Sequence, residues 1–236
     1  MKRYFDWEHG LLLIGLALLG WGCSRGLFGV PAEVFMQEIF RIFFLHVPTA
    51  WNSLLIGTVA FVAAIGTLLT RSRRWDAFLE ASVEVTLVLI IMVLIQGSIW
   101  GHGGTWGDTW WEWEPRLTAS AVMALSFAGV LSLRSFLEQF DRRATWTAVA
   151  TIVAYVDVPI VYLCVKWMPG LHQKQSTPET VSDIYHWPLR ANAIAILLIA
   201  IWLIVRRARL TLARDAARAD QPLPEAPQPG LIAGGD

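Results

Sequence analysis

The sequence predicts an all-α protein, a polytopic membrane bundle of six transmembrane helices with both termini in the cytoplasm. Of its 236 residues, 55% are hydrophobic and only 16% are charged. This balance is typical of integral membrane proteins and argues against a soluble globule or a disordered chain. Six apolar runs each approach the roughly 20 residues that cross a bilayer. Because lipid offers no partners to backbone polar groups, we expect these runs to be helices.

The six candidate spans follow one another with short connections, at residues 9–28, 48–70, 82–100, 117–136, 145–168 and 188–205. The first resembles a signal peptide, but acidic residues interrupt its basic region and no small-residue cleavage site follows. We therefore expect an uncleaved signal-anchor that remains as the first span. Residues 1–214 are expected to form one membrane domain, and the Ala- and Pro-rich residues 215–236 a disordered cytoplasmic tail.

The Lys and Arg residues are unevenly divided between the two sets of connections. With the N-terminus in the cytoplasm, thirteen of the 19 basic residues lie in inner segments. The positive-inside rule then places both termini inside. Three connections face outward: residues 29–47, the loop after the third span, and residues 169–187. The net charge is zero, so nothing suggests nucleic acid as a partner.

The loop from Trp106 to Thr118 (WGDTWWEWEPRLT) is unusually rich in tryptophan. It holds four of the chain's 13 Trp residues, Trp106, Trp110, Trp111 and Trp113, together with three acids and one Arg. Trp at a membrane face commonly belongs to an aromatic belt, and that interpretation stays open here. Four indoles in eight positions also form a platform for a large apolar plane with polar edges, and a porphyrin is such a plane.

Two histidines are expected at the depth of this loop, on the same side. His46 ends residues 31–48, which are expected to form an interfacial helix, with Pro48 in the first turn of the second span. His172 follows the fifth span closely. Because imidazoles are axial ligands of haem iron, the pair predicts a haem site with the Trp-rich loop as its floor. A surface role for either histidine also stays open.

Other polar residues are weaker candidates for the haem site. Arg116 could pair with a haem propionate, as Arg does with planar carboxylates. Lys174 and Arg190 are further candidates for that role. The outer His102 and His186 are more typical of surface histidines. His9 is expected to be structural, and Glu84 to be interfacial.

Asp157 lies within a span, where an acid is a functional candidate by default. We favour instead a hydrogen bond to a Ser, Thr or Tyr of a neighbouring helix, with Pro159 kinking its own helix. Cys23 and Cys164 lie in apolar runs and are expected to be free. The sequence has no CxxC or CxxCH motif, which disfavours a thiol oxidoreductase, a Cys-type zinc site and covalently attached haem.

Several motifs together resemble one family, the heme exporter protein C family (CcmC) of cytochrome c maturation. They occur in family order across nearly the whole chain: FRIFFLHVPTAW (residues 40–51), GSIWG (97–101), the Trp-rich loop, DVPIV (157–161) and LHQ (171–173). The Trp-rich loop alone would indicate only the broader haem-handling superfamily. The HVP and LHQ motifs indicate this narrower family.

The resemblance implies specific roles and partners. His46 and His172 would be the axial ligands of haem b, and Trp106, Gly107, Trp110, Trp111, Trp113 and Arg116 would form the loop that cradles it. The family holds haem at the periplasmic face of the bacterial inner membrane and presents it to a periplasmic haem chaperone. It works beside an ATP-binding-cassette ATPase, the membrane subunit of that transporter and a small single-span protein. The implied role is haem transfer, not enzymatic turnover.

The loop departs from the family pattern at two points. The family loop usually ends in Trp-Asp, where this chain has Trp113-Glu114, and it is one residue shorter, with Asp108 or Thr109 as the extra residue here. Alternatives also remain. They are a haem lyase or cytochrome c synthase of the same superfamily, a membrane b-type cytochrome, and a permease subunit of a haem transporter that binds no haem itself.

Overall fold

A computed structural model of the chain describes residues 7–168, 170 and 181–219. The helices are α1 (Trp7–Phe28), the short 3-10 helix η1 (Glu38–Ile42), α2 (Phe43–Thr70), α3 (Arg73–Gly104), α4 (Pro115–Ser135), α5 (Phe140–Tyr155), α6 (Asp157–Trp167) and α7 (Asp183–Ala219). Within the described ranges, six helical segments are long and apolar enough to cross a membrane, with α5 and α6 together forming the fifth. The predicted all-α fold with six spans is confirmed.

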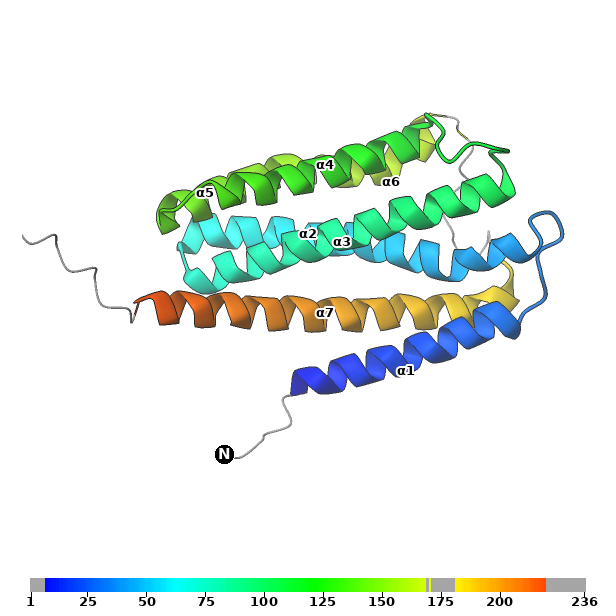
Figure 1. Cartoon of the computed structure of the whole chain (residues 1–236), viewed down its shortest axis with the longest axis horizontal. Helices are drawn as coiled ribbons and strands as arrows, with labels where there is room; N and C mark the ends of the chain where they lie inside the picture. Colours follow the sequence, from blue (N-terminus) through cyan, green and yellow to red (C-terminus); the bar gives the residue numbers. More distant parts are fainter. Residues whose placement is uncertain (1–6, 169, 171–180, 220–236) are drawn as a thin grey trace, which may run out of the picture.

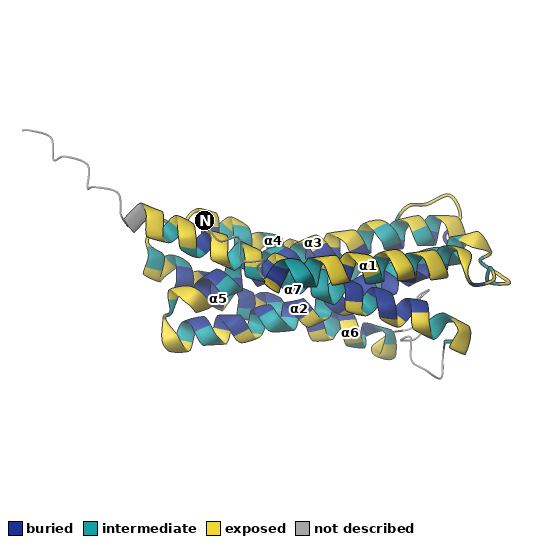
Figure 2. Cartoon of the chain, turned by 90° about the horizontal axis from the view of Figure 1, so that it is seen from below, coloured by how far each residue is buried: buried dark blue, intermediate teal, exposed yellow. Residues whose placement is uncertain are grey.

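The helices run alongside one another in layers (Figure 1). The α4 helix, with α5 and α6, lies on one side of the α2–α3 pair, and α7 covers the other side. The α1 helix packs mainly on α7 and forms the outermost element. In Figure 2 the exposed residues lie on the outward sides of the helices, as expected for surfaces that face lipid.

Glycines allow α1 to approach its neighbours closely. A Cβ atom at Gly15 would come within 2.9 Å of Ile199 on α7. A Cβ atom at Gly26 would come within 2.6 Å of the Phe44 ring on α2. Small residues at helix contacts are typical of membrane proteins, where backbone approach and van der Waals packing drive association.

The fifth span is broken where the sequence predicts a kink. Pro159 cannot donate to the carbonyl of Tyr155, and α5 ends at that residue. Two residues later α6 begins with Asp157, whose Oδ2 accepts a 2.6 Å hydrogen bond from the Ser126 hydroxyl of α4. Both the kink and the bond from a neighbouring helix agree with the expectation for Asp157.

The segment before the second span differs from the prediction. Residues 31–48 do not form one interfacial helix, since an isolated bridge joins Glu33 and Gln37 and only the short η1 follows. The α2 helix then begins at Phe43, so Pro48 lies inside it and not at its first turn. His46 is therefore part of the spanning helix, not of a connection outside it.

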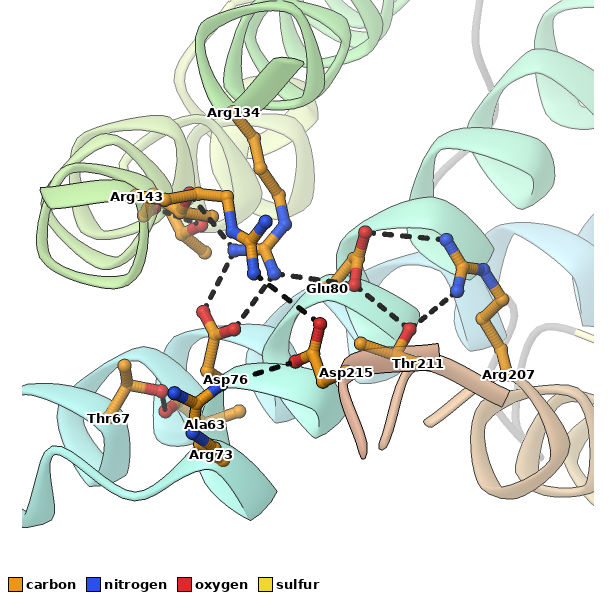
Figure 3. A network of polar contacts seen from close by, with 12 residues as sticks. Ala63, Thr67, Arg73, Asp76, Glu80, Arg134, Arg143, Arg207, Thr211 and Asp215 are labelled. Atoms are coloured by element: carbon orange, nitrogen blue, oxygen red, sulfur yellow. Dashed lines mark hydrogen bonds and ion pairs between the residues drawn. The ribbon is translucent and has the colours of Figure 1, made fainter. Parts of the chain in front are cut away.

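A buried ionic network ties the helices together at the end that carries both termini (Figure 3). Arg134 of α4 donates from both terminal nitrogens to the Asp76 carboxylate of α3, each at 2.8 Å. On α7, Arg207 pairs with Glu84 at 2.6 Å and with Glu80 at 3.3 Å. Glu84 thus has an inter-helix role. The α7 helix continues to Ala219, beyond the expected domain boundary at residue 214, and residues 220–236 lie outside the described ranges.

Candidate functional site

The candidate site lies at the end of the bundle opposite the termini (Figure 1). The loop between α3 and α4 meets there with residues 29–42, which connect α1 to α2, and with the start of α7. The described parts of the predicted outer connections thus lie at one end of the bundle.

His46 is held inside the bundle by an aromatic neighbour and a glycine. It lies in the first turns of α2 and is only 7% exposed. Its ring meets the Trp100 ring of α3 edge-on, with the ring centroids 5.5 Å apart. A Cβ atom at Gly97, one turn before Gly101 on α3, would lie 3.2 Å from His46 Cε1. The imidazole therefore rests almost directly on the backbone of α3.

Trp106 packs against the next turn of α3, at Gly101. It is 9% exposed, and its indole occupies the space that a side chain at Gly101 would need. The backbone N–H of Trp106 also donates to the Gly101 carbonyl at 2.8 Å. Gly97 and Gly101 are four residues apart and so lie on one face of the helix. They seat His46 and Trp106 against successive turns of α3.

The importance of this glycine pair was missed from the sequence, where GSIWG served only as a family motif. The signal that could have revealed it is the spacing of two glycines four apart on an apolar helix, which marks a close contact surface.

The other tryptophans of the loop point elsewhere. Trp110 is 58% exposed, and its ring stacks on His102 at a centroid distance of 3.9 Å. Trp113 is 81% exposed and meets Trp111 edge-on at 5.7 Å. The Nε1 atom of Trp111 is buried and has no hydrogen-bond partner within the described part of the chain. The four indoles therefore do not form one continuous floor.

Local hydrogen bonds shape the loop itself. Gly107 adopts a φ of 65°, a left-handed conformation that suits glycine and turns the chain after Trp106. The Thr109 hydroxyl donates to the Trp106 carbonyl at 3.3 Å and is 3.0 Å from a Glu112 carboxylate oxygen. The extra residue of this loop, Asp108 or Thr109, thus lies in its exposed tip.

The loop ends at a well-defined helix start. Glu114 is the N-cap residue of α4 and is buried, with Pro115 at the first helical position. Proline suits that position because the missing N–H would have no partner within the helix. The acid that departs from the family pattern is therefore fixed at the junction of loop and helix.

A cavity of about 170 Å³ lies beside His46 and Trp106. It reaches along α2 from His46 to Leu54, which is about 12 Å at the rise of a helix. Its walls are mainly apolar and come from α2, α3, α4 and α6. Among its described lining residues, Arg116 carries the only full charge, at the start of α4.

None of the remaining candidates within the described residues lines this cavity. His172 and Lys174 lie outside the described residues. Arg190 is exposed on α7, and His186 lies in the first turn of α7 with Nε2 2.9 Å from the Val181 carbonyl oxygen. His9 lies in α1 at the opposite end of the bundle. Cys23 and Cys164 are free, as expected.

The chain is similar to characterised proteins over most of its length. The profile of the family described as heme exporter protein C (CcmC) matches residues 3–222. The heme exporter protein C of Bradyrhizobium diazoefficiens is 31% identical over 195 residues, covering 81% of this chain and 73% of its own length. That of Haemophilus influenzae is 30% identical, covering 86% and 83%, and that of Escherichia coli K12 is 29% identical, covering 84% and 81%.

These matches agree with the six-span helical bundle. The family name indicates haem handling in cytochrome c maturation, and transport or transfer in place of catalysis. The chain belongs to the heme exporter protein C family.

Proposed function

We propose that this protein binds haem b at the periplasmic face of the bacterial inner membrane and transfers it to a periplasmic haem chaperone. The observation that carries the proposal is the placement of His46 and Trp106 on one glycine-lined face of α3, beside an apolar cavity with a single Arg. An imidazole, an indole plane and a guanidinium match the iron, the macrocycle and the propionates of haem.

The residues present fit this cargo by their chemistry. His46 would supply one axial ligand and His172 the second. The Trp106 indole would contact the porphyrin, and Arg116 would pair with a propionate. The sequence lacks a CxxCH motif, so binding would be non-covalent and reversible.

The size of the cavity supports transfer over storage. Its roughly 170 Å³ is below the range of about 300–1,000 Å³ typical of sites that enclose a ligand. The chain would therefore cover part of the haem and leave another part open to the partner. The exposed Trp110 and Trp113 lie at this end of the bundle, where a chaperone would approach.

Partners complete the proposed pathway. The sequence has no P-loop, so any dependence on ATP would come from a transporter ATPase with its membrane subunit. A small single-span protein would complete the assembly. The role of this chain in that assembly would be to hold and orient haem, with any covalent bond formed on the chaperone.

The test is to purify the protein from a haem-replete host and compare the absorption spectra of variants. We expect His46→Ala and His172→Ala each to lose most of the bound haem or to change its axial ligation. His102→Ala is the matched control, because His102 is at the same end but stacks on the exposed Trp110. Wild-type spectra in both His46→Ala and His172→Ala would refute the ligand assignment, whereas wild-type protein that purifies without haem would favour the permease-subunit alternative.

A further inference from the structure

The position of His46 depends on a proline that interrupts the hydrogen bonds of its own helix. Pro48 lies inside α2 and has no backbone N–H. The carbonyl of Phe44, four residues earlier, therefore lacks its usual donor. Phe44 is buried, so this carbonyl needs a partner from elsewhere in the bundle.

Asn192 of α7 supplies that partner. Its side-chain Nδ2 donates to the Phe44 carbonyl oxygen at 2.7 Å, and Asn192 is fully buried. The two residues are 148 positions apart in the sequence, so the bond joins the start of the second span to the last span. A donor from another helix thus replaces the one that proline removes.

The α1 helix leaves space for the Asn192 amide. A Cβ atom at Gly22 of α1 would overlap the Asn192 Oδ1 atom. The neighbouring Cys23 thiol lies 3.9 Å from the same oxygen. A second amide, that of Asn52, donates to the Ala193 carbonyl at 3.0 Å and to the Pro48 carbonyl at 2.8 Å. The amide side chains of Asn192 and Asn52 thus connect α1, α2 and α7, and we call this set of contacts the joint.

This joint lies next to the histidine. Phe44 and His46 belong to the same stretch of α2, so the amide that holds the Phe44 carbonyl also fixes the turn from which the imidazole extends. On its other side the imidazole meets Trp100 and Gly97 of α3. We propose that Asn192 is a positioning residue, which holds this turn of α2 so that His46 presents its ring to haem iron. The proposal rests on the proposed haem-binding function.

A double-mutant cycle with Pro48 tests it. Asn192→Leu removes the donor, and Pro48→Ala restores a backbone N–H to the Phe44 carbonyl. We expect Asn192→Leu to reduce haem with native ligation by at least about tenfold, and Pro48→Ala/Asn192→Leu to recover most of it. Thr86→Val is the matched control, because Thr86 is fully buried and donates only within α3, to the Ser82 carbonyl.

The readouts separate this proposal from the proposed function. Resonance Raman spectra of bound haem report axial ligation, and hydrogen exchange over residues 43–49 reports the turn in haem-free protein. Faster exchange in Asn192→Leu, reversed by Pro48→Ala, is expected whether or not haem binds. Native ligation and exchange in Asn192→Leu would overturn the positioning role, as would failure of Pro48→Ala to restore them.

Two further results are decisive. If Asn192→Leu does not accumulate in the membrane, the double variant still decides the question: accumulation with the native spectrum supports the role, and absence contradicts it. If haem binding in the wild-type background does not depend on His46, the proposed function fails, while the exchange result still reports on the joint.

Discussion

At the scale of single residues, the site depends on what glycines leave open. His46 and Trp106 both lie where α3 has no side chain, at Gly97 and Gly101. Their rings therefore reach the helix backbone at successive turns and line the same cavity. The sequence identified the histidine and the tryptophan by residue type. Their placement against one face of α3 follows from the two glycines, which have no side chain.

Gly101→Ala is expected to disturb the site, because the added methyl would overlap the Trp106 ring. Overpacking of this kind costs about 1–3 kcal/mol. Thermal unfolding in detergent should show the loss of stability, and purified protein should carry less haem. Gly129→Ala is the control, since its Cβ would meet nothing within 4 Å, and it should stabilise α4 by roughly 0.5–1 kcal/mol. Equal behaviour of the two variants would contradict the proposed packing role of Gly101.

Arg116→Ala is expected to weaken haem binding without abolishing it. Arg116 is the charged member of the described cavity lining, and a charge-assisted hydrogen bond contributes about 1.5–3 kcal/mol. Haem titration should therefore give an affinity roughly 10- to 150-fold lower with unchanged axial ligation. Arg190→Ala, on the exposed side of α7, is the matched control. Full loading of the chaperone by Arg116→Ala would argue against a propionate contact.

At the scale of elements, a buried ion pair connects α3 and α4 near the end that carries the termini. Arg134 is 6% exposed and Asp76 1%, and the two side chains form a bidentate pair. Arg134 is one of the thirteen basic residues that the sequence assigns to inner segments. In the structure its side chain turns into the bundle, because carboxylates of α3 are available to pair with it.

Arg134→Gln should be strongly destabilising, because it leaves the buried Asp76 charge without its guanidinium. Removing one partner of such a pair costs about 3–5 kcal/mol. Arg73→Gln is the control, since the Arg73 side chain is 60% exposed, 3.9 Å from Asp215 and 4.2 Å from the centre of the Phe140 ring, and it should change stability by no more than about 1 kcal/mol. Chemical unfolding in detergent measures both. A small effect of Arg134→Gln would show that water reaches the pair.

At the scale of the whole molecule, the inter-helix ion pairs and the candidate site lie at opposite ends of the bundle. The end at which α1 begins and α7 ends holds the ionic network of α3, α4 and α7. Glu8 of α1 also pairs there with Arg206 and Arg209 of α7. The opposite end holds the Trp-rich loop and the cavity. The positive-inside rule then predicts that the loop end faces the periplasm.

Cysteine labelling tests this orientation. In intact spheroplasts, a membrane-impermeant maleimide should react with Asp108→Cys, which is exposed at the loop tip, and not with Gln139→Cys, which is exposed between α4 and α5. Both should react after the membrane is opened. Wild-type protein, whose Cys23 and Cys164 are half-buried and buried, gives the background. The reverse pattern would place the candidate site in the cytoplasm.

The sequence by itself determined the fold class, the six spans and the kink at Pro159. Long apolar runs have helix as their stable solution in lipid, and proline breaks a helix through its own backbone, so both signals are local. The sequence also identified His46 and the Trp-rich loop by residue type, and the role of His172 stays a prediction. The tertiary structure alone decided that α2 begins before His46 and that Trp106, not Trp110 or Trp113, packs inside the bundle. It also decided that Asn192 completes the helix at Phe44. These features depend on contacts between helices distant in sequence, where a glycine gives space or a side chain donates a hydrogen bond, and no local pattern specifies such contacts.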